Sequence, residues 1–148
     1  MASMDQEQAA RVWQRVRGQL PEDEGLGLER LITGEWEAAH AYAGLSRRVG
    51  SREGEILRRM AREEQGHCAV LQGMYTMLTG KHFTPPAAKP IPGTVAEVLR
   101  ACWKGEKTSV AAYDSRSRDE EFGAVFAQLR DQEQQHCRWV LELLGKGL

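Results

Sequence analysis

Four stretches of the chain have apolar side chains at alternating steps of three and four residues, the spacing of helices with one buried face. These stretches are residues 26–49, 52–78, 94–115 and 119–144. Helices of this kind must bury their apolar faces against one another, and 148 residues suffice for one domain with a substantial core. The sequence therefore predicts an all-α protein whose single folded domain is a four-helix bundle.

The segments between these stretches predict how the helices connect. Gly50 and Ser51 separate the first two helices, with Ser51 as the expected N-cap of the second. Residues 80–93 contain four prolines in fourteen residues and cannot lie inside a helix. Extended at about 3 Å per residue, this segment reaches roughly 40 Å, enough to run the length of a bundle. We expect two antiparallel hairpins joined by this long crossover.

The N-terminal part of the chain predicts one further element. Residues 5–20 have the spacing of a shorter amphipathic helix, and the proline and glycines of residues 21–27 are expected to end it. This helix either caps the bundle or packs on a second subunit. We therefore divide the chain into an N-terminal region, residues 1–25, and a bundle domain, residues 26–148.

Composition and charge exclude several classes of protein. The net charge is −1, and no block of basic residues suggests binding to nucleic acid or to a membrane surface. The apolar runs are too short to span a membrane, and the acidic, polar start differs from a signal peptide. The three cysteines are far apart and form no Cys-x-x-Cys pair, which argues against a zinc ribbon or a disulfide framework. We expect a cytoplasmic protein in a reducing compartment.

The chain also contains an internal duplication. Glu-Gln-x-His-Cys occurs at residues 64–68 and again at residues 133–137, 69 positions later. Gly-Glu followed by a tyrosine, at residues 34–42 and 105–113, repeats at an offset of 71. Because the two offsets differ by only two residues, we expect two similar helical hairpins.

Six charged or titratable residues occupy inward-facing positions of these helices, where their neighbours are mostly apolar. A buried carboxylate costs several kcal/mol unless it is paired or bound to a metal. Each Glu-x-x-His pair lies on one helix face, one turn apart, as ligands to a common cation would. The six residues are Glu35, Glu64, His67, Glu106, Glu133 and His136.

The turns place these six residues at one height. The midpoint of Glu35 and Glu64 falls at the first predicted hairpin turn, and that of Glu106 and Glu133 falls next to the second. Residues equidistant from the turn of an antiparallel hairpin lie opposite each other, so packing the hairpins together brings the four carboxylates and both imidazoles into one site. Two divalent cations would neutralise the four negative charges, and mixed oxygen and imidazole ligands suit iron or manganese.

This constellation resembles the ferritin-like di-iron superfamily, most closely its rubrerythrin and bacterioferritin branch. The resemblance covers residues 26–144 and depends on the duplicated Glu-x6-Tyr and Glu-x-x-His patterns. It implies a ferritin-like bundle with two metal ions. The implied ligands are Glu35 and Glu106 as terminal ligands, Glu64 and Glu133 as bridges, and His67 and His136 at one metal each.

The resemblance also implies residues that support the ligands. Tyr42 and Tyr113, two turns beyond the terminal glutamates, would be hydrogen-bond donors in the catalytic site. Members of the superfamily often have an acid just before the bridging glutamate, where it orients a histidine; Glu63 fits this position and Gln132 does not. Ser109 stands where rubrerythrins have an additional glutamate, and the chain has no rubredoxin domain with an electron relay of its own.

The function implied is that of a di-iron oxidoreductase. Two iron ions, or manganese at one or both positions, would reduce hydrogen peroxide or dioxygen in a rubrerythrin-like peroxidase or a ferroxidase. Electrons would come from an external donor protein or from Fe(II), and we expect a homodimer that acts in oxidative stress. Two alternatives stay open: iron binding without turnover, and hydroxylation of an organic substrate, which would need an apolar pocket beside the metals.

Other candidate residues have simpler interpretations. Glu37 and His40 form a third Glu-x-x-His pair, but they lie off the inward face and are expected to be solvated. Cys68 and Cys137 follow the two histidines and are expected to be small core residues. The alternative for these cysteines is a thiol pair that a peroxide-consuming site would oxidise.

Overall fold

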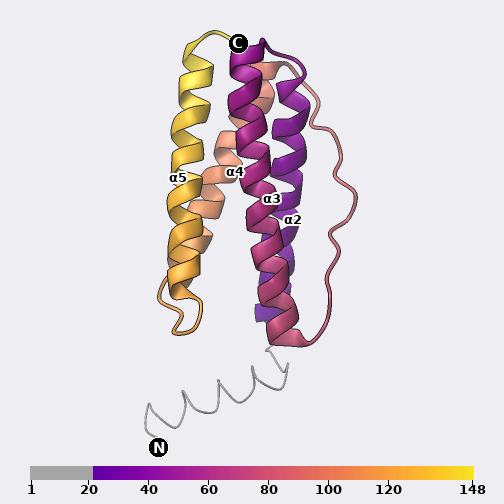
Figure 1. Ribbon diagram of the computed structural model, residues 1–148, viewed down its shortest axis with the longest axis vertical. Coiled ribbons are helices and arrows are strands. Elements are labelled where there is room, and N and C mark those ends of the chain that lie inside the picture. Colours follow the sequence, from indigo (N-terminus) through magenta and orange to yellow (C-terminus); the bar gives the residue numbers. More distant parts are fainter. Residues whose placement is uncertain (1–21) are drawn as a thin grey trace, which may run out of the picture.

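The computed structural model describes residues 22–148, which form a four-helix bundle (Figure 1). Its helices are α2 (Glu22–Ser46), α3 (Ser51–Thr79), α4 (Val95–Arg116) and α5 (Gly123–Gly145). Helix α2 packs mainly against α3, and α4 mainly against α5, and no strand occurs in residues 22–148. The all-α bundle predicted from the sequence is confirmed. The predicted N-terminal helix, residues 5–20, lies outside the described residues.

The crossover between the two hairpins runs along the outside of the bundle from one end to the other (Figure 1). Gly80 ends α3 with φ 70°, a left-handed conformation that glycine adopts without strain, and its amide donates to the Thr76 carbonyl at 2.8 Å. Thr94 caps α4, because its hydroxyl accepts a hydrogen bond from the Glu97 amide at 3.1 Å. Helix α4 therefore begins near the α2–α3 turn and runs antiparallel to α2.

The start of α2 differs from the prediction. The helix begins at Glu22 and continues through Gly25 and Gly27, where the sequence suggested a break. Gly27 permits a close approach: a Cβ at this position would lie 2.5 Å from Nη2 of Arg116 on α4. The low helix propensity of the two glycines therefore does not interrupt α2, which periodicity within one segment does not reveal.

Two other helix starts also differ from the prediction. Ser51 is not an N-cap, because Gly50 occupies that position and its carbonyl accepts the first helical hydrogen bond, at 2.8 Å. Helix α5 begins at Gly123 rather than near residue 119. The Asp119 carboxylate accepts hydrogen bonds from the amides of residues 121 and 122, at 3.1 and 2.7 Å, and holds this segment in a turn.

The buried apolar side chains form two clusters, one toward each end of the bundle. The first includes Leu28 and Ile32 of α2 with Phe126 of α5, and the second includes Leu45 of α2 with Val140 of α5. Polar and charged residues fill the layer between the clusters. Among the described residues, no helix is long and apolar enough to cross a membrane.

Candidate metal centre

The layer between the two apolar clusters contains all six residues that the sequence singled out. They come from all four helices, and none is more than 4% exposed. Helix α2 contributes one, α3 two, α4 one and α5 two: Glu35, Glu64, His67, Glu106, Glu133 and His136. The structure therefore brings the six residues together at the height that the hairpin turns predict.

The six residues form two overlapping groups. One comprises Glu35, Glu64, His67 and Glu133, and the other comprises Glu64, Glu106, Glu133 and His136; in each group one atom per residue lies within 4.8 Å of the others. Glu64 and Glu133 belong to both groups. Nδ1 of His67 lies 2.8 Å from Oε1 of Glu133, and Nδ1 of His136 lies 2.7 Å from Oε1 of Glu64, so each imidazole approaches the shared glutamate of the opposite hairpin. Each group could hold a cation, and the two groups share two carboxylates.

The chemistry of these side chains fits metal binding because each has one buried N or O atom that makes no hydrogen bond of good geometry, although Nδ1 of each histidine lies close to a carboxylate oxygen of the set. The unpartnered atoms are Oε2 of Glu35 and Glu106, Oε1 of Glu64 and Glu133, and Nδ1 of His67 and His136. Leaving a buried polar atom unpaired costs about 1–3 kcal/mol, and more when it is charged. Six such atoms facing one another are expected in a site that binds cations, and oxygen with imidazole ligands suits iron or manganese.

Burial and mutual contact shift the pKa values of the metal-free site. Burial raises the pKa of Glu64 and of Glu133 well above ordinary values, with further increases from the charge of Glu35 and from the contact of Glu133 with Glu106. Burial lowers the pKa of His67 and His136, but the nearby carboxylates outweigh it and raise both values overall. Without cations, burial and the mutual contacts therefore favour the protonated forms of both shared glutamates and of the imidazoles.

Metal binding is expected to release these protons, since ligands must be deprotonated before they bind a cation. Because raised pKa values favour the protonated forms, metal affinity should increase as the pH rises. Titration of Mn(II) into metal-free protein in a weakly buffered indicator solution should release about two protons per chain or more. Binding of Mn(II) without proton release would contradict the protonation assigned to Glu64 and Glu133.

Tyr42 and Tyr113 connect the two hairpins across the site. The Tyr42 hydroxyl on α2 donates to Oε1 of Glu106 on α4 at 2.7 Å, and the Tyr113 hydroxyl on α4 donates to Oε1 of Glu35 on α2. Both rings are fully buried. Burial and the adjacent carboxylates raise the pKa of both phenols, so both remain protonated donors. Each tyrosine therefore orients the glutamate of the opposite hairpin, rather than the one on its own helix.

The two imidazoles have chemically different partners on their outer side. Nε2 of His136 lies 3.1 Å from Oε1 of Glu63, whereas Nε2 of His67 donates to the amide oxygen of Gln132. Partial burial alone would raise the pKa of Glu63, but hydrogen bonds from His136 and Arg59 lower it, so this partner is anionic. The contact of Gln132 with His67 was not predicted. The duplication could have indicated it, because Gln132 occupies the position in the second half that Glu63 occupies in the first.

The third Glu-x-x-His pair and the cysteines lie outside the set of candidate ligands. Glu37 and His40 are exposed and lie outside the site. All three cysteines are buried and unpaired. Burial raises the pKa of the Cys102 thiol to about 12 and that of Cys137 to about 11, so these thiols stay protonated and react slowly.

Two openings approach the site from opposite sides of the bundle. A cleft of about 540 Å³ between α2 and α4 reaches Glu64, Glu106 and Glu133. A more open groove of about 860 Å³ between α3 and α5 reaches Glu63 and Gln132, the outer partners of the histidines. The carboxylates are therefore approached from the α2–α4 face, and the outer partners of the imidazoles, Glu63 and Gln132, from the α3–α5 face.

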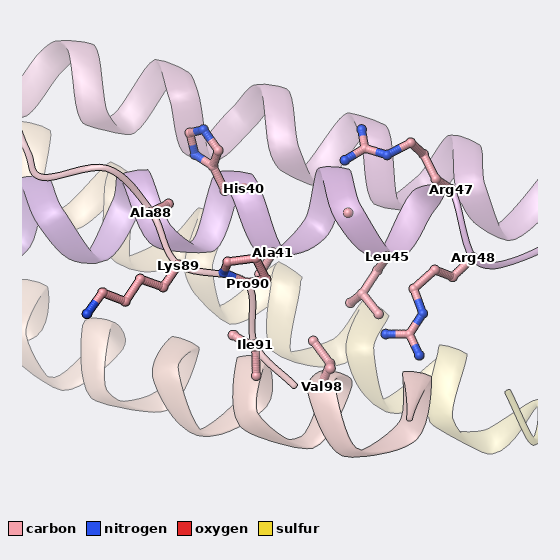
Figure 2. Close-up of a pocket in the computed structure, with 11 residues that line it drawn as sticks. His40, Ala41, Leu45, Arg47, Arg48, Ala88, Lys89, Pro90, Ile91 and Val98 are labelled. Atoms are coloured by element: carbon pink, nitrogen blue, oxygen red, sulfur yellow. The ribbon is translucent and has the colours of Figure 1, made fainter. Parts of the chain in front are cut away.

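The crossover covers one end of the α2–α4 face. Figure 2 shows Pro90 beside Ala41 of α2, and Ile91 reaching toward Val98 of α4. These residues line a separate pocket of about 260 Å³. Lys89 points away from this pocket (Figure 2), so its basic residues do not converge on one point.

Comparisons with known proteins identify one distant relative. The chain is 29% identical over 122 residues to the uncharacterized protein YhjR of Bacillus subtilis (strain 168), in an alignment covering 79% of this chain and 83% of that protein. No family model and no solved structure matches the chain. The function must therefore be inferred from the site.

Proposed function

We propose that the protein is a member of the ferritin-like di-iron superfamily and reduces hydrogen peroxide or dioxygen at a two-metal centre. The observation that supports this most directly is the set of six unpartnered buried atoms, one on each residue that the resemblance implies as a ligand. Two positions sharing Glu64 and Glu133 are suited to a metal pair. A single structural ion would not need ligands from all four helices in two overlapping groups.

The chain's own residues would bind and orient the metals. Glu35 and Glu106 would be terminal ligands, each fixed by a tyrosine hydroxyl from the opposite hairpin. Glu64 and Glu133 would bridge, because each belongs to both groups. A bound iron pair, or manganese at one or both positions, would supply the redox chemistry for reducing peroxide or dioxygen. The electrons would come from an external donor protein or from Fe(II), in the cytoplasm of a cell under oxidative stress.

Anaerobic loading followed by stopped-flow mixing tests this function. Metal-free protein loaded with two Fe(II) per chain should oxidise them on mixing with peroxide or dioxygen about tenfold or more faster than free Fe(II) in the same buffer. Faster reaction with peroxide would favour the peroxidase, and faster reaction with dioxygen the ferroxidase. Iron that stays bound but oxidises no faster than free Fe(II) would contradict the enzyme and favour iron sequestration.

A further inference from the structure

Two glycines beside the candidate ligands leave unfilled space. Gly34 and Gly105 precede Glu35 and Glu106, and both line the cleft between α2 and α4. No atom lies within 4 Å of the Cβ position at either glycine, and neither has a positive φ. A glycine within a helix costs about 1 kcal/mol relative to alanine. Neither close packing nor backbone conformation requires glycine at these two positions, and both leave open space in the cleft beside the carboxylates.

The cleft that these glycines open is much larger than peroxide or dioxygen requires. Its volume is about 540 Å³, and small residues such as Ala38 and Ala101 line it on both helices. Along α2 it extends from Gly27 to Ala41, roughly 21 Å at 1.5 Å per residue. Ile91 of the crossover adds an apolar side chain to its lining. The volume of the cleft and the small and apolar residues along it suit an organic molecule with a long apolar part.

The inner wall of the cleft is polar and belongs to the candidate metal centre. Glu64, Glu106 and Glu133 line it, and each is at most 2% exposed. Each also has one of the unpartnered carboxylate oxygens. A molecule lying in the cleft would therefore pass directly beside the proposed metals.

Positive charge gathers at the end of the cleft away from Ile91. Arg30 of α2 and Arg116 of α4 line this end, and Arg116 reaches across the bare backbone of Gly27. The Arg116 guanidinium also lies over the Phe126 ring, 5.8 Å from its centroid. Glu37 is exposed at the mouth, about 10 Å along α2 from Arg30. Two guanidinium groups at one end of the cleft favour a carboxylate, which they can bind with charge-assisted hydrogen bonds.

We propose that the cleft binds a linear alkyl carboxylate, with its carboxylate at Arg30 and Arg116 and its chain over Gly34 and Gly105. The proposal rests on the proposed metal centre, because three of its candidate ligands, Glu64, Glu106 and Glu133, form the inner wall of the cleft. The proposed function, reduction of peroxide or dioxygen, does not require an organic ligand, so this proposal goes beyond it.

Calorimetric titration of octanoate into Mn(II)-loaded protein tests the proposal, with 1-octanol as a neutral ligand of equal chain length. Octanoate should bind once per chain, about tenfold or more tighter than octanol. The double variant Arg30→Gln, Arg116→Gln should lose this preference and keep its affinity for octanol. Equal binding of the two ligands to the unmodified protein, or no binding of octanoate, would overturn the proposal.

Filling the cleft provides the second arm of the test. Gly34→Leu and Gly105→Leu should each abolish octanoate binding, whereas the matched control Gly73→Leu, at an exposed glycine with equally open space on α3, should not. Unchanged octanoate binding in both cleft variants would overturn the proposal. Mn(II) content is measured first in every sample. Failure of the unmodified protein to bind Mn(II) would overturn the metal centre and this proposal together, whereas Mn(II) binding without octanoate binding would overturn this proposal alone.

Discussion

Replacing Glu64 and Glu133 together with alanine is expected to abolish two-metal binding. Both glutamates belong to both groups of candidate ligands, so their loss leaves each group with one carboxylate and one imidazole. Metal analysis after equilibrium dialysis against Fe(II) or Mn(II) should give two ions per chain for the unmodified protein and fewer than one for the variant. A variant that retains two ions per chain would show that the shared ligands are wrongly assigned.

Thermal unfolding gives the same experiment a second readout. At a metal concentration about 100 times the Kd of each position, each of the two ions should stabilise the unmodified protein by about 2.7 kcal/mol, which together is roughly 10–20 °C in Tm. The double variant should show no such increase. The Glu37→Ala variant is the matched control, because Glu37 is an exposed glutamate followed by a histidine at the same spacing as the ligand pairs. It should keep both ions and the full increase in Tm.

The two metal positions are expected to differ in affinity because their histidines have different outer partners. The Glu63 carboxylate makes His136 a stronger ligand than the neutral Gln132 amide makes His67. Metal should therefore occupy the His136 position first. Glu63→Gln should lower affinity at this position about 10–100-fold, and Gln132→Glu should raise affinity at the His67 position by a similar factor.

Titration of metal-free protein with Co(II), followed by visible absorption and calorimetry, measures both affinities. The double exchange Glu63→Gln, Gln132→Glu is the most informative variant, because it keeps the composition of the site and should reverse the order of filling. Asp131→Asn, at an exposed acid beside Gln132, is the control for a general effect of charge. Two equal affinities in the unmodified protein, unaltered by either substitution, would contradict the role given to these partners.

The four helices and the meeting of the six residues could be predicted because both depend on regular helical geometry. A rise of 1.5 Å per residue fixes heights relative to a turn, and buried carboxylates are conspicuous on an otherwise apolar face. The crossover was predictable from the four prolines of residues 80–93, and it runs the length of the bundle as expected.

Features that depend on contacts between helices could not be predicted. The break expected near Gly27 is absent, and the side chain of Arg116, 89 positions away in the sequence, reaches this glycine. The exchange of hydrogen bonds, from Tyr42 to Glu106 and from Tyr113 to Glu35, depends on how the hairpins face each other. Spacing within a helix contains no information on that orientation. The cleft over Gly34 and Gly105 was not predictable for the same reason.

Elemental analysis of the protein purified from its native host tests the central claim most directly. The buried site of four glutamates and two histidines predicts two transition-metal ions per chain, iron or manganese, in samples prepared without chelators. Protein that is folded and contains no transition metal, or a single zinc ion per chain, would contradict the two-metal centre.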